Sequence, residues 1–247
     1  GAGSAGSVLA SRLTENPDCS VLLIEAGPDY PGIDFLPAEI KYGFGSQIGG
    51  STLRDISGHS FDLINSPHSW QYIATATPSA VPMPLPRGKI MGGSSAINYA
   101  AFLRGIPEDF ESWASHGNDL WSFDKVLPYF VKSESDLGFD EEYHGKHGPI
   151  PVRHADSSLW NPIQHGFYNA CLRSGYQDCP DHNYPYAEGV GPPTFNRVNG
   201  IRYSTALTYI EPARNRENLT IWTNCLVHRV IFSGARAVGI SVESDGN

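Results

Sequence analysis

The first six residues constrain the fold more than any other part of the chain, because they follow the pattern G-x-G-x-x-G. In this pattern the first glycine permits a tight turn, the second lets the backbone approach a pyrophosphate, and the third lets a helix pack closely on a strand. The apolar residues Val8, Leu9 and Leu13 then predict a helix over residues 4–15. The N-terminus of such a helix carries a partial positive charge that suits a phosphate.

The next segment completes one unit of a dinucleotide-binding fold. Residues 16–18 break the predicted helix, and the apolar run from Val21 to Ile24 predicts a parallel strand that is buried on both faces. Glu25 follows, where an acidic residue accepts hydrogen bonds from ribose hydroxyls. A motif of this kind normally follows a hydrophobic strand. We therefore expect residue 1 to be a truncation, with the central strand of the sheet lying before it.

Composition argues against several classes of protein. With 247 residues and 40% hydrophobic content, the chain is able to bury a sizeable core. Its 17 basic and 26 acidic residues give a net charge of −9, which argues against a nucleic-acid partner. No apolar run of about 18 residues predicts a transmembrane segment. The four cysteines lack C-x-x-C spacing and are interpreted as reduced thiols, which favours a cytoplasmic location.

A second glycine-rich segment covers residues 86–105. The pair Gly92-Gly93, followed by Ser94 and Asn98, indicates a backbone that passes very close to a bound group. Together with the opening motif, this segment resembles the flavin-contacting signature of the glucose-methanol-choline (GMC) oxidoreductases, in their choline dehydrogenase-like branch. The resemblance extends over the whole chain, and it covers about half of a full-length member.

The resemblance implies an α/β fold. It consists of an FAD/NAD(P)-binding Rossmann-like domain, incomplete in this chain, with part of an α+β substrate-binding domain. Residues 1–150 would form the N-terminal part of the FAD-binding domain. Residues 151–212 would form part of the substrate domain, and residues 213–247 would supply strands that return to the FAD-binding domain.

The cofactor that the resemblance implies is FAD. Some family members attach it covalently through a His directly before the signature Asn. Here that residue is Ile97, so we expect non-covalent FAD. The motif and the resemblance together give the expected cofactor-binding residues, which are Gly1, Gly3, Ser4, Ala5, Gly6, Glu25, Ala26, Ile90, Gly92, Gly93, Ser94, Asn98, Tyr99, Ala100, Ala101 and Val227.

The reaction that the resemblance implies is oxidation of the CH–OH group of a small-molecule alcohol, with hydride passing to flavin N5 and a His acting as general base. None of the nine histidines has that context, so no catalytic residue is named, and the base is expected outside this chain. The alcohol and the electron acceptor stay open. The alternatives are an FAD-containing hydroxynitrile lyase, a non-catalytic FAD-binding fragment, and an NAD-dependent Rossmann enzyme, which the signature disfavours.

The remaining patterns predict scaffold. Helices are expected to start at Pro107 and near Ser122 and to cover residues 162–174. Asn199-Gly200 has the chemistry of a hairpin turn. Strands are expected over residues 70–75, 150–152, 219–223, 227–232 and 237–242.

Two interpretations concern individual side chains. The aromatic residues Trp113, Trp121, Tyr129 and Phe130 are interpreted as core, as are Ile163, Phe167, Ala170 and Cys171 on one side of the helix over residues 162–174. The loop His144–Pro149, whose neighbours in sequence include Glu141 and Glu142, is not expected to bind a metal.

Overall fold

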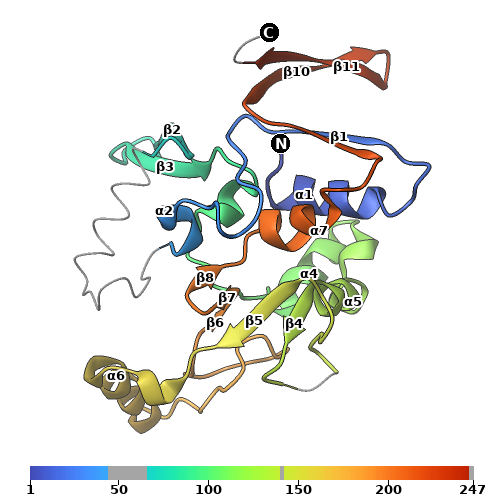
Figure 1. Cartoon of the computed structure of the whole chain (residues 1–247). Helices are drawn as coiled ribbons and strands as arrows, with labels where there is room; N and C mark the ends of the chain where they lie inside the picture. The colour runs from blue at the N-terminus through green and yellow to red at the C-terminus, as the bar shows by residue number, and fades with distance from the viewer. Residues whose placement is uncertain (44–65, 140–141, 245–247) are drawn as a thin grey trace. The chain divides into compact units, whose positions relative to one another are not determined.

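The computed structural model describes residues 1–43, 66–139 and 142–244 (Figure 1). The chain divides into two compact units. The first combines residues 1–99 with residues 200–247, and the second contains residues 100–199. These limits differ from the predicted boundaries at 150 and 212, and the assignment of segments to cofactor and substrate domains stays a prediction. Glu141 and residues 44–65 of the long excursion after the first strand lie outside the described residues.

The first unit begins with the predicted helix and strand. Helix α1 (Ser4–Leu13) is followed by β1 (Val21–Ile24), which pairs in parallel with β9 (Leu219–Trp222). Segments from both ends of the chain therefore lie side by side, as the blue and orange ribbons of Figure 1 show. The core of this unit contains Ala2, Ala10, Leu23, Met91, Ile210, Ala213 and Leu219. The α/β fold expected from the sequence is confirmed here.

Two antiparallel hairpins belong to the first unit. Strand β2 (Ser69–Ala74) pairs with β3 (Met83–Gly88), and β10 (Cys225–Ser233) pairs with β11 (Arg236–Ser244). The predicted strands in these regions are thus confirmed. Short elements complete the unit: α2 (Ala38–Lys41), the 3₁₀ turn η1 (Gly93–Ala96), β8 (Ile201–Arg202), the π-helical turn η4 (Ala206–Ile210) and α7 (Glu211–Ala213).

The second unit packs helices beside a small sheet. Its helices are α4 (Pro107–Ser115), α5 (Phe123–Ser133) and α6 (Pro162–Arg173), with 3₁₀ turns η2 (Asp119–Trp121) and η3 (Ser157–Leu159). Its strands are β4 (Glu134–Asp136), β5 (Ile150–His154), β6 (Thr194–Phe195) and β7 (Arg197–Val198). Strand β5 pairs in parallel with β4 and antiparallel with β6.

Local chemistry accounts for several of these boundaries. The Asn161 side chain accepts a hydrogen bond from the backbone N–H of Gln164 at 3.0 Å, and the Gln164 side chain accepts one from the Asn161 N–H at 2.9 Å. This reciprocal capping box begins α6 at Pro162. Gly175, with φ of +94°, follows the end of α6. Asn199 and Gly200 both have positive φ, as the predicted hairpin turn requires.

The prediction that four aromatic residues form core is wrong for three of them. Trp113, Trp121 and Tyr129 are between 50% and 71% exposed, whereas Phe130 is half-buried. The interior position is taken by Phe110, which is buried, and Trp113 packs edge-to-face against its ring with centroids 5.5 Å apart. Helical spacing identifies an apolar face, but it does not say which of its members another element will cover.

The buried side predicted for α6 is also wrong. Ile163 and Phe167 are 83% and 66% exposed, Ala170 is exposed, and α6 buries none of its residues among those the structure describes. The helix has a favourable capping box and propensity, and Trp160 packs edge-to-face against Tyr168 on its surface, with ring centroids 5.4 Å apart. Across residues 1–43, 66–139 and 142–244, no helix combines the length and apolar character needed to cross a membrane.

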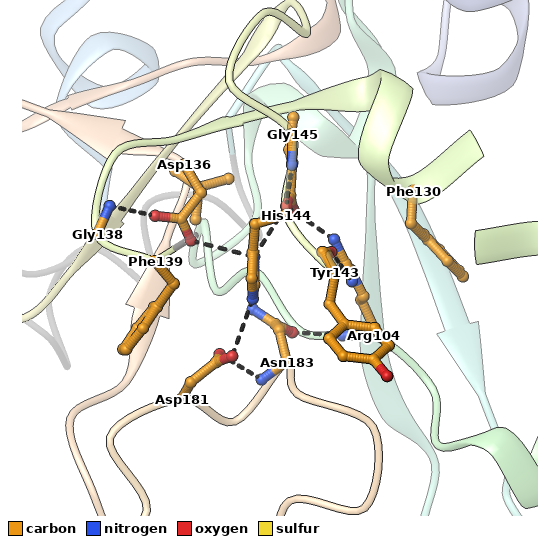
Figure 2. Close-up of polar contacts among 12 residues, drawn as sticks. Arg104, Phe130, Asp136, Gly138, Phe139, Tyr143, His144, Gly145, Asp181 and Asn183 are labelled. Carbon is orange, nitrogen blue, oxygen red and sulfur yellow. Dashed lines mark hydrogen bonds and ion pairs between the residues drawn. The ribbon is translucent and has the colours of Figure 1, made fainter. Parts of the chain in front are cut away.

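His144 lies at the centre of a buried polar cluster in the second unit (Figure 2). Its Nδ1 is 3.0 Å from Oε1 of Glu134 and 3.5 Å from Oδ2 of Asp136, and its Nε2 is 2.9 Å from Oδ2 of Asp181. Arg104 places a guanidinium nitrogen 2.7 Å from the same Glu134 oxygen. All five side chains are less than a tenth exposed. The cluster ties β4 to segments that precede α4 and follow α6.

The contacts of His144 require its charged form, because an imidazole donates from both ring nitrogens only when it is protonated. Burial by itself lowers the pKa of His144, but hydrogen bonds to Asp181 and then Glu134 outweigh burial and raise this pKa to about 9. For Asp181, burial raises the pKa, and the hydrogen bond from His144 lowers it to below its ordinary value. The cluster is therefore a set of mutually stabilised ions.

We expect the protein to lose stability in alkaline solution. The folded-state pKa of His144, about 9, lies above its ordinary value of 6.5. The stabilisation that this histidine provides is therefore complete below pH 6.5 and is lost as pH rises through about 9. A shift of this size corresponds to about 3 kcal/mol. The measurement is the urea midpoint of unfolding at a series of pH values across that window.

The matched variants are His144→Gln and His228→Gln. The first should unfold at lower urea and lose the alkaline slope, because the titrating group is gone. The second removes a half-exposed imidazole that pairs with Glu243 at 2.9 Å, and it should keep the wild-type profile. A wild-type urea midpoint that stays constant over this pH range would contradict the interpretation.

Candidate cofactor site

A cavity of about 390 Å³ lies at the N-terminus of α1 in the first unit, and we call it the motif cavity. Its volume is within the range of about 300–1,000 Å³ that is typical of small-molecule sites. The residues that line it are Gly1, Gly3, Ser4, Ile24, Glu25, Ala26, Trp70, Gly88, Gly93, Ser94, Cys225, Leu226 and Val227. Eight of the sixteen predicted cofactor-binding residues are therefore brought together: Gly1, Gly3, Ser4, Glu25, Ala26, Gly93, Ser94 and Val227.

The backbone of Ala2 joins three of the segments that line the motif cavity. Its N–H donates to Oε2 of Glu25 at 2.8 Å, which connects the opening motif to the end of β1. Its carbonyl accepts from the N–H of Gly92 at 2.8 Å and from the Ser7 hydroxyl at 2.9 Å. Ala2 is fully buried, so each of these bonds is made where water cannot replace it.

Glycine is required where these segments meet. A Cβ atom on Gly93 would lie 2.6 Å from the Cα of Gly3, and one on Gly88 would lie 2.2 Å from the backbone carbon of Gly93. A Cβ on Gly6 would lie 2.0 Å from the carbonyl oxygen of Gly1. The third glycine of the motif thus lets the helix pack against the first glycine. Backbone atoms, rather than side chains, form much of the cavity wall.

Glu25 is buried but still lines the motif cavity. Its Oε1 accepts from the Gly27 N–H at 3.1 Å, in addition to the Ala2 bond on Oε2. Each carboxylate oxygen has two lone pairs, so the group keeps the capacity to accept a further bond from a hydroxyl. Its predicted contact with ribose stays a prediction, and the structure adds a second role, which is to hold the opening turn in place.

Trp70 is a lining residue that sequence reasoning missed. The register of the β2–β3 hairpin pairs Ser69 with Gly88 and Trp70 with Arg87, which sets the indole beside the signature segment. Tyr72 stacks on the indole with ring centroids 5.8 Å apart, and Lys89 places its ammonium 5.1 Å from the centre of the Trp70 ring. No spacing in the sequence marks Trp70, because its position depends on a hairpin formed with a partner strand.

The other predicted contacts do not line the motif cavity; they are Ala5, Gly6, Ile90, Gly92, Asn98, Tyr99, Ala100 and Ala101. Ile90 is buried among Ile40, Ala96 and Ile97, so its side chain serves the core. Gly92 contributes through its hydrogen bond to Ala2. Ala100 and Ala101 belong to the second unit. Contact between these eight residues and a cofactor stays a prediction.

The buried cluster around His144 also has the composition of a metal site. Ligand atoms from Glu134, Asp136 and His144 lie within 4.8 Å of one another. However, both ring nitrogens of His144 point their protons at carboxylates, and the Arg104 guanidinium already pairs with Glu134. A metal would need a ring nitrogen without a proton. We therefore describe this group as an ion-pair network, and the expectation of no metal stays a prediction.

The chemistry of the motif cavity fits a dinucleotide. The N-terminus of α1 has no acidic residue in its first turn, and an α-helix leaves its first N–H groups without intrahelical partners. Gly1, Gly3 and Gly93 line the cavity beside this helix N-terminus without a side chain. A buried carboxylate stands at the end of β1. These features suit, in turn, a pyrophosphate and a ribose.

Comparisons with known proteins identify the family of the chain. The family model described as GMC oxidoreductase matches residues 1–247. An oxygen-dependent choline dehydrogenase of Pseudomonas aeruginosa is 39% identical over 249 residues, with 98% of this chain and 41% of the relative covered. An uncharacterized GMC-type oxidoreductase of Rhodococcus erythropolis is 38% identical over 250 residues, with 100% of this chain and 46% of the relative covered.

A solved structure shows the same relation. Pyridoxine 4-oxidase from Mesorbium loti superposes with a TM-score of 0.83 at 30% identity, covering 100% of this chain and 45% of that one. The chain spans less than half of the length of these relatives. The family match over every residue and the likeness in structure lead to one conclusion: the chain belongs to the GMC oxidoreductase family, whose cofactor is FAD.

Proposed function

We propose that the whole protein containing this chain oxidises the CH–OH group of a small-molecule alcohol with FAD as hydride acceptor. The observation that carries the proposal is the motif cavity, which combines the helix N-terminus, Glu25 and the Gly93-Ser94 pair in one lining. Family membership supports the reaction class. The relatives described above include a choline dehydrogenase and a pyridoxine 4-oxidase, which differ in substrate, so the proposal stops at the class of substrate.

In this proposal different residues of the chain bind different parts of the cofactor. Gly1, Gly3 and Ser4, with the first N–H groups of α1, would hold the pyrophosphate. Glu25 and Ala26 would hold the ribose, and Val227 on β10 would lie against the adenine end. These assignments are supported by the shared lining of the cavity.

The signature would serve the flavin end. Gly93 lets the backbone come close, and the Ser94 hydroxyl, which accepts from the Gly88 N–H at 3.1 Å, keeps its own proton to donate. Trp70 would close this side of the cavity with an apolar ring. When bound, FAD supplies the redox chemistry, and the protein supplies orientation and exclusion of water.

No histidine lines the motif cavity, so we assign no catalytic residue within the chain. We propose that the general base comes from another part of the whole protein. A non-catalytic, FAD-binding role for the chain by itself stays an alternative for the same reason. The hydroxynitrile lyase alternative finds no support in the relatives reported above, which are named as oxidoreductases, dehydrogenases and oxidases.

The compartment and the electron acceptor belong to the same proposal. The four cysteines are free thiols, two of them buried, which is consistent with a reducing cytoplasm. The proposal leaves the acceptor as oxygen, a quinone or another carrier.

The first prediction from this function concerns the bond between protein and flavin. The whole protein, purified without added cofactor, should show flavin absorption in the visible range. Acid precipitation should release the flavin into the supernatant, because Ile97 offers no nucleophile where some family members use a histidine. Flavin in the washed pellet would contradict the non-covalent assignment, and a colourless folded protein would contradict the cofactor site.

A second prediction tests the glycine contact inside the site. Gly93 and Gly234 have φ of +52° and +58°, so alanine strains the backbone similarly at either position. A Cβ on Gly234 meets nothing within 4 Å, whereas a Cβ on Gly93 would meet the Gly3 backbone at 2.6 Å. Gly93→Ala should therefore cost about 1–3 kcal/mol more stability than Gly234→Ala, measured by urea unfolding.

The same pair of variants should separate in cofactor content. Gly93→Ala should lower the flavin-to-protein absorbance ratio, because relieving the contact requires movement of the opening turn. Gly234→Ala lies in the β10–β11 turn and should retain flavin at the wild-type ratio. Equal effects of the two substitutions on both readouts would show that the close approach of Gly3 and Gly93 does not matter.

The third prediction is the test of the reaction. Under nitrogen, at least one member of a panel of alcohols should bleach the flavin absorption of the whole protein, and oxygen or an artificial acceptor should restore it. Dithionite serves as the control that the flavin can be reduced. The proposal would be wrong if no alcohol bleached the flavin. If the protein then also released cyanide from mandelonitrile with an unchanged flavin spectrum, it would be a hydroxynitrile lyase instead.

A further inference from the structure

A second cavity, of about 570 Å³, lies within the second unit and has a different lining. We call it the aromatic cavity, because Phe139, Tyr143 and Tyr184 contribute three rings to its wall. Figure 2 shows Phe139 and Tyr143 on either side of His144, with Asp181 near the imidazole. The aromatic cavity therefore shares Asp181 with the buried ion cluster.

The rings of Tyr143 and Tyr184 form the best-defined part of this wall. Their centroids are 5.1 Å apart and their planes meet at 79°, an edge-to-face pair. Tyr184 is 51% exposed and Tyr143 is partly buried, so both rings are accessible from the cavity side. Aromatic faces carry negative charge density and attract a cation within about 6 Å of the ring centre.

The charged part of the lining is entirely acidic. Its charged residues are Glu142, Asp178, Asp181 and Glu188, and it contains no lysine, arginine or histidine. Asp178 accepts a hydrogen bond from the Tyr168 hydroxyl at 3.0 Å, which fixes its position without removing its charge. A hydrogen bond to the neighbouring carboxylate of Glu142 raises the pKa of Tyr143, so this acid lies at the phenol.

Nearby cations do not cancel this charge. Arg104 and protonated His144 face Glu134, Asp136 and Asp181 within the buried cluster. Lys146 donates its ammonium to the Phe139 carbonyl. His154 also pairs with Asp136, at 2.8 Å, within the buried cluster. No cation lies among the lining residues that would balance Glu142, Asp178 and Glu188, so the wall keeps an excess of negative charge.

We propose that the aromatic cavity binds a small organic ammonium ion. The rings of Tyr143, Tyr184 and Phe139 would contact its apolar and charged surface, and the carboxylates would balance its charge. Ring faces cannot ligate a metal ion, for which oxygen ligands would be needed on all sides. A neutral apolar ligand would make no favourable contact with the four lining acids. It would also remove water from them, and that desolvation is unfavourable.

The direct test is isothermal titration calorimetry of the whole, flavin-loaded protein with tetramethylammonium chloride. This ion has no hydroxyl group, so it cannot be oxidised as an alcohol. Sodium chloride at equal concentration controls for ionic strength, and tert-butanol controls for a neutral molecule of similar shape. Saturable binding of tetramethylammonium alone supports the proposal. Equal heats from sodium chloride, or equal binding of tert-butanol, overturn it.

Variants at the half-exposed tyrosine locate the site. Tyr184→Leu should weaken tetramethylammonium binding by about 3- to 30-fold, because the ring face is lost. Tyr184→Phe should bind as the wild type does, because the ring and not the hydroxyl makes the contact. Tyr129→Leu removes a ring that is 71% exposed on α5 and outside this lining, and it should have no effect. Equal weakening by Tyr184→Leu and Tyr129→Leu would overturn the assignment.

A charge variant completes the test, and a separate readout keeps the two proposals apart. Glu188→Gln keeps the size of an exposed lining side chain and should weaken tetramethylammonium binding while leaving any residual tert-butanol signal unchanged. Flavin content and alcohol-dependent bleaching are measured on the same samples. Loss of ammonium binding with normal bleaching, or the reverse, shows which of the two proposals fails.

Discussion

The architecture of the first unit depends on the backbone of one residue, Ala2. Its N–H and its carbonyl bind three separate parts of the chain: the carboxylate that ends β1, the glycine pair of the signature and the first turn of α1. None of these bonds needs a particular side chain at residue 2. They require the backbones of the opening motif and of the signature to approach each other closely. Glycines stand at these positions because a Cβ atom there would collide with the neighbouring backbone.

In the second unit, buried polar groups are paired by side chains instead of by the backbone. Around His144, carboxylates from β4 and from the segment after α6 meet one imidazolium and one guanidinium. The Ala2 junction combines backbone groups with the Glu25 carboxylate, whereas the cluster loses the stabilisation that His144 provides as pH rises through the pKa of this residue, about 9. The cluster also buries Nε of Arg104 and Oε2 of Glu134 without a hydrogen-bond partner among the described residues, so its polar groups are not fully paired.

The sequence indicated local structure well because local structure rests on local chemistry. The opening motif, the strand up to Ile24, the hairpin turn at Asn199-Gly200 and the capped start of α6 each follow from neighbouring residues. Trp70 could not be found this way, since its place beside the signature depends on the register of two strands. The burial of Trp113 was predicted wrongly because periodicity cannot tell which apolar residue another element covers. The His144 cluster joins residues up to 77 positions apart, from Arg104 to Asp181, and has no signature in any window of the sequence.

The lining of the motif cavity contains one ionisable acid, Glu25, and no lysine or arginine. A diphosphate held there would be balanced by peptide dipoles, which neither gain nor lose protons and cannot rotate without moving the chain. In the proposed site the attraction for the anion would come from main-chain geometry together with the hydroxyls of Ser4 and Ser94. Folding of the opening turn and retention of the anion then become a single equilibrium: whatever loosens the Ala2 peptide releases the ligand, and a bound ligand tightens the peptide in return.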